Sequence, residues 1–210
     1  PGDPKIRAPM NLKILYHGNC FDGCASAALL SRFLRERERF GAVRFVPLTH
    51  GQGSPFGADA FAGDVNACVD FRFSPSPRLH WWFDHHASAF PAPEDRAAFE
   101  RDASGQKFWD PKAPSCAGFI ARTLAARFGW RPAGLDELVR WAEVIDAAAF
   151  ESPGQAVQLA EPALQDLSGQ RAPPEAFRPR LRPGPQFAGR ALRALCPGPF
   201  RAARARRLGV

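Results

Sequence analysis

Four short runs of strand-forming residues constrain the fold of this chain more than any other feature. They cover residues 12–16, 43–48, 67–71 and 79–83 and are rich in aliphatic and aromatic side chains. The segments between them are rich in Gly, Pro and Ser or have a helical composition, and strands joined by such connections are typical of a parallel sheet. We therefore predict an α/β fold with an open, mainly parallel sheet flanked by helices.

Three segments have the composition expected of the flanking helices. Residues 25–39 are rich in Ala, Leu and Arg, residues 115–128 follow Pro114, and residues 135–149 lie between Gly-containing turns. A proline just before a helix and glycines around it are common boundary signals. Ser115 suits either capping of the second helix or anion binding, and capping is the commoner use of a hydroxyl there.

Composition divides the chain into three parts. Residues 1–9 precede the single methionine, Met10, and are taken as an N-terminal extension. Residues 10–152 form the predicted α/β domain. Residues 153–210 are rich in proline and arginine, which predicts a weakly ordered extension or a truncated or degenerate second domain, with helical composition only over 156–167.

The positive charge of the chain is concentrated in this C-terminal extension. The whole chain carries +7, but residues 168–210 hold ten arginines and a single acidic residue, so they carry +9 and the remainder carries −2. Any contact with nucleic acid is therefore expected through the arginine-rich tail rather than through the body of the protein.

The cysteines and the apolar runs bear on the cellular compartment. Five widely scattered cysteines without a CxxC pair are expected to be reduced thiols rather than a disulfide framework. No apolar run approaches the roughly 20 residues of a membrane-spanning helix, and no signal-peptide pattern follows the first basic residues. We therefore expect a cytoplasmic protein without a membrane partner.

Histidine and aspartate side chains stand where the predicted strands end. In an open parallel sheet these ends share one edge, where ligands bind. Imidazoles and carboxylates can hold two divalent ions about 3.5–4 Å apart, which activate water and neutralise phosphoryl charge. The alternative is structural, because an Asp after a strand often caps a turn or helix. The candidates are His17 and Asp22 after the first run, Asp70 in the third, Asp84, His85 and His86 after the fourth, and Asp146 late in the last helix.

Four motifs resemble, in their order, those of the DHH phosphoesterase superfamily. They are His17-Gly-Asn-Cys-Phe-Asp22-Gly, Val69-Asp70-Phe71, Asp84-His85-His86 and Ile145-Asp146, and the resemblance covers about residues 12–150. It implies a phosphohydrolase with two divalent ions, most often Mn²⁺, with Mg²⁺, Zn²⁺ or Fe²⁺ as alternatives. The implied substrate is a phosphorylated small molecule or a short oligonucleotide.

The same resemblance implies a role for each residue. His17 and Asp70 would hold one ion, with Asp70 bridging to the second. His86 would face the substrate phosphate, and Asp84 would position the triplet. Water activated by the ions, rather than a Ser or Cys side chain, would attack phosphorus. The second ion would be held by Asp22, His85 and Asp146.

Two departures from the superfamily pattern bear on activity. Cys20 stands where the first aspartate of a D-x-D pair is usual, so the first metal position would be empty, changed in metal preference or completed by water. Alternatively, Cys20 simply packs behind the loop. The Gly-Gly-His loop of the usual C-terminal domain is also missing from residues 153–210. A catalytically weak or inactive protein that binds nucleotides or nucleic acid is therefore the alternative function.

Overall fold

The computed structural model describes residues 9–51, 53–131 and 133–157. Most of the predicted C-terminal extension, including most of the candidate helix 156–167, lies outside these residues. The elements are, in chain order, β1 Met10–His17, α1 Phe21–Arg37, β2 Phe40–Leu48, β3 Val65–Val69, β4 Trp81–Asp84, α2 Pro93–Glu100, β5 Lys107–Trp109, α3 Cys116–Phe128, α4 Asp136–Asp146 and α5 Pro153–Val157.

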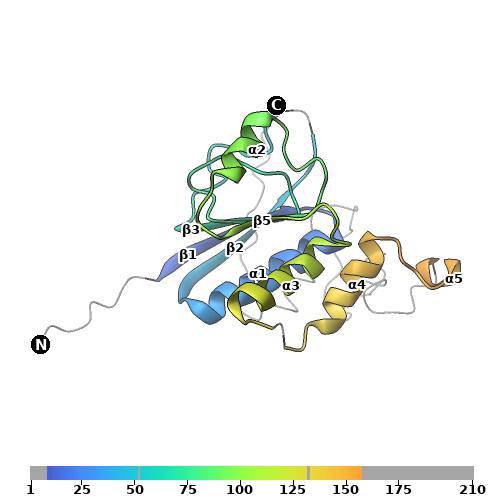
Figure 1. Cartoon of the computed structure of the whole chain (residues 1–210). Helices are drawn as coiled ribbons and strands as arrows, with labels where there is room; N and C mark the ends of the chain where they lie inside the picture. Colours follow the sequence, from blue (N-terminus) through green and yellow to red (C-terminus); the bar gives the residue numbers. More distant parts are fainter. Residues whose placement is uncertain (1–8, 52, 132, 158–210) are drawn as a thin grey trace, which may run out of the picture.

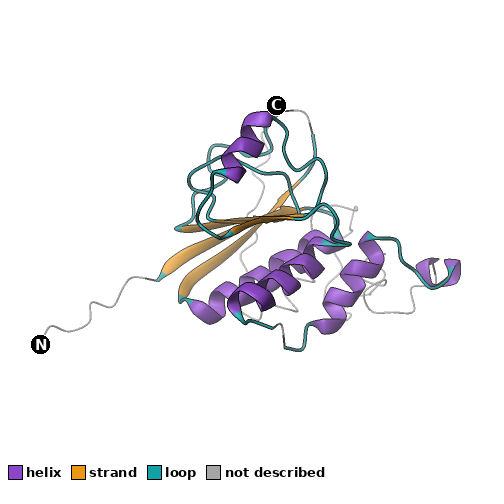
Figure 2. Ribbon diagram, viewed as in Figure 1, coloured by secondary structure: helices purple, strands orange, loops and turns teal. Residues whose placement is uncertain are grey.

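The five strands form one sheet in the order β2-β1-β3-β4-β5, and every neighbouring pair is parallel. The prediction of an open parallel sheet is therefore confirmed (Figure 2). All strands end at the same edge, and the chain changes its direction of winding between β1 and β3. In sheets of this order the crevice outside that switch point is where ligands bind.

The sheet is covered on both faces, as Figure 1 shows. Helices α1, α3 and α4 lie on one face, and α2 with the long loops lies on the other. Side chains alternate accordingly along the strands. Ile14 and Phe83 point into the core shared with α1 and α3, whereas Leu15 and Trp82 point into the second core beneath α2. Both faces are thus apolar, as expected for a parallel sheet buried between layers.

Helix α1 is buried along most of its length, and its composition explains why. Small residues such as Ala25, Ser26, Ala27 and Ala28 let the helix lie close to the sheet while α3 and α4 also pack against it. The observed helix begins at Phe21, earlier than the predicted start at residue 25. The first turn that the prediction left out carries Asp22, so part of the candidate site is helical.

The sequence analysis missed α2 and β5, and some predicted elements end earlier than expected. Helix α2 has no buried residue and strand β5 has three residues, so neither produces a strong apolar pattern. Strand β3 ends before Asp70, and α4 ends before Ala148, because both residues adopt positive φ values. Ser115 caps α3 by accepting a hydrogen bond from the Gly118 amide, as predicted.

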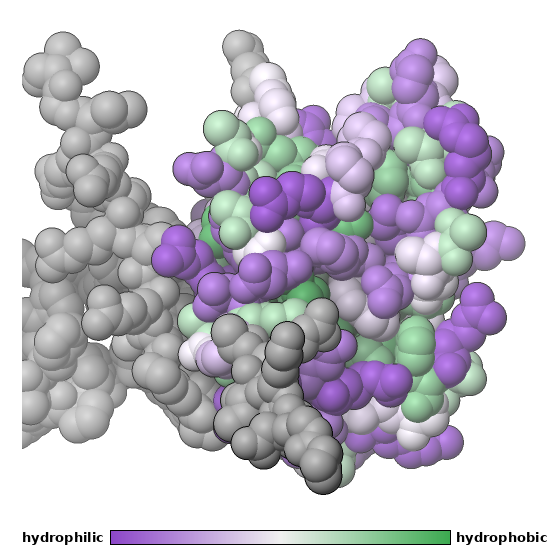
Figure 3. Space-filling model, turned by 90° about the vertical axis from the view of Figure 1, so that its left-hand side faces the viewer, coloured by the Kyte–Doolittle hydropathy of each residue, from purple (hydrophilic) through white to green (hydrophobic). Residues whose placement is uncertain are grey.

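The surface shown in Figure 3 is mixed, with hydrophilic side chains spread over the face and hydrophobic ones in small groups between them. Within the described residues, no helix has the length and apolar character needed to cross a membrane.

Candidate metal centre

A tight turn joins β1 to α1 and places two candidate ligands beside each other. His17 is the last residue of β1 and Cys20 is the N-cap of α1. The Gly18 amide donates to the Leu48 carbonyl at 2.7 Å, and Asn19 has a left-handed φ of 58°. This turn directs the side chains of His17 and Cys20 toward the end of β3.

The close approach of α1 to β1 depends on a glycine. A Cβ atom at Gly23 would lie 2.2 Å from the His17 carbonyl oxygen, which is far inside van der Waals contact. Only glycine therefore allows the first turn of α1 to lie against the end of β1. This explains physically why a Gly follows Asp22 in the loop motif.

Asp70 lies at the centre of the site in a strained backbone conformation. Its φ is 54°, in the left-handed region that residues other than glycine seldom adopt, and its amide donates to the Phe83 carbonyl at 2.9 Å. The side chain is 1% exposed. Its oxygens lie 3.4 Å from His17 Nδ1 and 3.4 Å from His85 Nε2. Strain of this kind persists where the surroundings hold it, often at functional sites.

Asp84 fixes the two histidines that follow it. Its side chain is fully buried, and its Oδ1 accepts hydrogen bonds from the amides of His85 and His86 at 2.8 and 3.2 Å. The same oxygen accepts from the His86 ring Nδ1 at 2.7 Å. The Nδ1 of His85 donates to the Ala113 carbonyl at 2.9 Å, so its Nε2 faces the carboxylates. Asp84 therefore fixes the backbone of His85 and both the backbone and the ring of His86.

His85 Nε2 is surrounded by three carboxylates. It lies 3.6 Å from Asp22 Oδ2, 3.4 Å from Asp70 Oδ1 and 3.3 Å from Asp146 Oδ2. Asp22 is buried, and its two oxygens accept the amide hydrogens of Cys116 and Ala117 at 2.6 and 2.9 Å. Asp146, at the end of α4, has a side chain that is 26% exposed. The second predicted ligand group is therefore assembled from α1, α4 and the end of β4.

The charges of these groups are strongly perturbed by burial and by one another. Burial, followed by the charge of Asp70, raises the pKa of Asp22 well above its ordinary value. Burial would also raise the pKa of Asp70, but the imidazoles of His17, His85 and His86 lower it below its ordinary value. Burial lowers the pKa of His85, whereas Asp70, the Ala113 carbonyl and Asp22 raise it to about 9. Burial, and next Asp70, raise the pKa of the Cys20 thiol.

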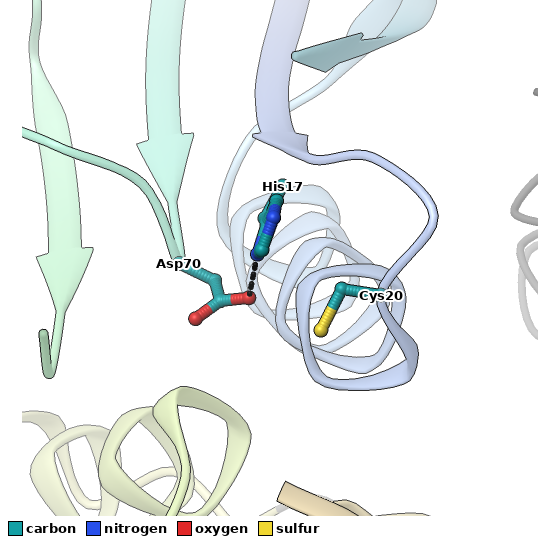
Figure 4. A group of neighbouring side chains, drawn as sticks. All are labelled: His17, Cys20 and Asp70. Carbon is teal, nitrogen blue, oxygen red and sulfur yellow. Dashed lines mark ion pairs between the residues drawn. The ribbon is translucent and has the colours of Figure 1, made fainter. Parts of the chain in front are cut away.

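The side chains fall into three groups whose ligand atoms lie within 4.8 Å of one another. The groups are His17, Cys20 and Asp70; Asp70, His85 and His86; and Asp22, His85 and Asp146. Figure 4 shows the first group, with its side chains converging from β1, the N-cap of α1 and the end of β3. Asp70 belongs to two groups and is thus placed where a ligand shared by two ions would be.

The hydrogen bonding of the donor set shows whether it suits metal ions. Buried polar groups are nearly always hydrogen-bonded, and an exception needs an explanation. In the part of the chain that the structure describes, five buried atoms of this cluster have no hydrogen-bond partner: His17 Nδ1, Asp70 Oδ1, Asp70 Oδ2, Asp84 Oδ2 and His85 Nε2. Four of them face the shared centre as potential ligand atoms, so the set fits divalent cations.

The structure places one further histidine at the site that the sequence analysis did not single out. His50 follows the end of β2, and its ring stacks on Phe71 at 4.6 Å between centroids. Its edge meets the His17 ring at 4.9 Å. It belongs to no motif, but it obeys the same rule as the other candidates, because it stands at the carboxyl end of a parallel strand.

Comparisons with known proteins give one distant similarity. No protein-family model matches the chain, and no curated protein sequence matches it. Among solved structures, the chain is similar to an exopolyphosphatase-related protein from Bacteroides fragilis, with 16% sequence identity and a TM-score of 0.45. The similarity covers 80% of this chain and 54% of that protein, so this chain spans about half of its length.

Proposed function

We propose that this protein is a metal-dependent phosphoesterase that hydrolyses a phosphate ester in a nucleotide or a short oligonucleotide. The observation that carries the proposal is Asp70, whose buried carboxylate has no hydrogen-bond donor among the described residues and lies between two ligand groups. The four sequence motifs that resemble the DHH superfamily support the same reaction class. The location at the switch point of a parallel sheet is the usual place for such a site.

The residues divide into holders of metal and positioners. His17, Cys20 and Asp70 would hold one ion, and Asp70, Asp22, His85 and Asp146 would hold the other. Two divalent ions, most often Mn²⁺ in proteins that resemble this one, supply a Lewis acid and an activated water. The carboxylates of Asp22 and Asp70 are shielded from solvent, each being 1% exposed.

His86 and Asp84 would act on the substrate side of the centre. The His86 side chain is 36% exposed, so a phosphate group can reach it, and its ring is held by the hydrogen bond from Nδ1 to Asp84. Asp84 would act through His85 and His86, because its side chain is fully buried. A ring fixed before substrate arrives loses little freedom on binding.

The thiol at Cys20 favours a second candidate function. With a thiol in place of a carboxylate, the first ion would be weakly held, and the protein would bind nucleotides or nucleic acid with little hydrolysis. The arginine-rich tail over residues 168–210 would then add sequence-independent contacts to phosphates.

The two functions separate in a hydrolysis assay on the full chain. We would supply Mn²⁺, Mg²⁺ or Zn²⁺ with bis-p-nitrophenyl phosphate, a dinucleotide or a nucleoside bisphosphate. We expect hydrolysis that falls to background in Asp70→Ala and in His85→Ala, whereas His80→Ala, at a histidine that precedes β4 at the opposite edge, keeps it.

Hydrolysis that persists unchanged in Asp70→Ala and His85→Ala would show that the proposed site is wrong. Tight RNA binding without hydrolysis in any metal would instead favour the binding function.

A further inference from the structure

We infer that the two metal positions take different ions. The group of His17, Cys20 and Asp70 is a mixed nitrogen, sulfur and oxygen site that takes Zn²⁺, whereas the group of Asp22, His85 and Asp146 takes a harder ion such as Mn²⁺. This inference rests on the proposed function, because it requires that the cluster bind metal. It deepens that function by assigning the chemistry of each position.

The side chain of Cys20 points toward His17 and Asp70. The turn over Gly18 and Asn19 directs its side chain toward the same point as the His17 ring, as Figure 4 shows. The sulfur, a His17 nitrogen and an Asp70 oxygen lie within 4.8 Å of one another. Cys20 therefore faces the site and does not pack behind the loop.

The ligand atoms of Cys20's partners face each other, with His17 Nδ1 3.4 Å from Asp70 Oδ2. Among the described residues, His17 Nδ1 and both oxygens of Asp70 are buried without a hydrogen-bond partner, and Asp70 is 1% exposed. Such atoms are costly to bury unless a cation or donor meets them. Three protein ligands of this kind, with a fourth position open, are the usual set of a catalytic zinc site.

The two groups differ in the kind of ligand atoms that they offer, because only the first contains a sulfur. A thiolate favours Zn²⁺ or Fe²⁺, whereas carboxylates suit Mg²⁺ and Mn²⁺. The second group contains two carboxylates and one imidazole but no sulfur. The two positions therefore differ in metal preference.

Cobalt substitution tests the inference without relying on catalysis. The full-length protein would be stripped with a chelator and titrated with Co²⁺ while its absorption is recorded. We expect two bound ions and a thiolate-to-cobalt charge-transfer band in the near ultraviolet. The band should vanish in Cys20→Ser and persist in Cys24→Ser, the matched control one helical turn away in the apolar core.

Metal competition gives a second readout. After dialysis against equal Zn²⁺ and Mn²⁺, the wild-type protein should retain about one ion of each kind by elemental analysis. Cys20→Asp should retain Mn²⁺ at both positions, and its Zn²⁺ affinity should fall by more than about 100-fold. Removal of a residue that only supports a ligand already lowers metal affinity by up to about 100-fold, and loss of the ligand itself should lower it further. Cys20→Asp also serves if Cys20→Ser fails to fold.

Each remaining outcome overturns a specific claim. Two bound cobalt ions without a charge-transfer band, or a band that persists in Cys20→Ser, would show that Cys20 is not a ligand while leaving the proposed metal centre intact. Retention of equal Zn²⁺ by Cys20→Asp would refute the assigned preference. No cobalt binding at all would overturn the proposed function together with this inference.

Discussion

Asp22 serves the fold and the candidate metal centre with the same two oxygen atoms. Its oxygens accept the first two amide hydrogens of α3, and one of them lies 3.6 Å from His85 Nε2. Asp146 is a candidate for the same ion, but it is partly exposed and its nearest partner is the His85 ring. Loss of the two carboxylates should therefore have different consequences.

We predict that Asp22→Ala lowers the free energy of unfolding of the metal-free protein by about 2 kcal/mol or more. The substitution leaves two buried N–H groups without an acceptor, which costs about 1–3 kcal/mol for each group. Removal of a buried carboxylate beside Asp70 offsets part of this cost. Asp146→Ala should change stability by less than about 0.5 kcal/mol. Urea unfolding in the presence of a chelator measures both. Equal stability of the two variants would contradict the capping role of Asp22.

At the residue scale, sequence patterns singled out side chains that the structure brings together, but not all of their contacts. The strand ends and motifs predicted the residues that the structure brings together, because a parallel sheet gathers its carboxyl ends at one edge. The double hydrogen bond from α3 to Asp22 joins residues 94 and 95 positions apart. No local pattern predicts this contact. His50, by contrast, stands two residues after β2, so the strand-end rule applied to the second run would have found it.

At the scale of elements, the contact between β1 and α1 controls the geometry of the site. Gly23 lets the first turn of α1 rest on the His17 carbonyl, and this holds Cys20, the N-cap, and Asp22, in the first turn, close to the end of β1. Displacement of the helix by even a small amount would separate these side chains from Asp70.

We predict that Gly23→Ala lowers the free energy of unfolding by about 1–3 kcal/mol, because its Cβ would overlap the His17 carbonyl oxygen. Helix propensity alone predicts the opposite sign, because it favours Ala over Gly by about 1 kcal/mol within a helix. Gly57→Ala is the control, since a Cβ there meets nothing within 4 Å. Thermal unfolding of both variants checks the prediction, and an unchanged Gly23→Ala would show that α1 can shift freely.

The sequence pattern of each helix and strand explains whether it could be predicted. Strands β1 and β4 contain consecutive buried apolar residues. Helix α1 buries a surface of small residues, and α3 buries a face that includes Ile120 and Leu124. Helix α2 packs over the second core by partly buried residues only, and β5 is an edge strand of three residues. Tertiary contacts rather than local pattern define these two elements.

At the scale of the whole molecule, a metal centre would link elements that are far apart in the sequence. Helix α4 contacts α1 and α3 but lies apart from the sheet in Figure 1. Through Asp146 it would share an ion with His85 after β4 and with Asp22 on α1. Bound metal should therefore stabilise the whole domain and reduce the opening of α4 in particular.

We predict that metal at about 100 times its dissociation constant stabilises the protein by about 2.7 kcal/mol and raises Tm by about 5–10 °C. Calorimetry with and without a chelator measures the shift, and hydrogen exchange should show added protection in α4. The gain should disappear in Asp70→Ala but remain in His80→Ala. A metal-independent Tm in the wild-type protein would contradict a centre built from these residues.

The candidate ligands are spread from residue 17 to residue 146, and this spread sets the order of events during synthesis. On the ribosome, His17, Cys20 and Asp22 emerge first, and Asp70 and His85 follow, but Asp146 appears only after α3 has left the exit tunnel. Domains assemble as units while chains grow by about 5–20 residues per second. The nascent chain would thus expose an incomplete set of donors for several seconds. Because the domain assembles as a unit, both positions would be complete only after Asp146 has emerged and α4 has docked on α1 and α3.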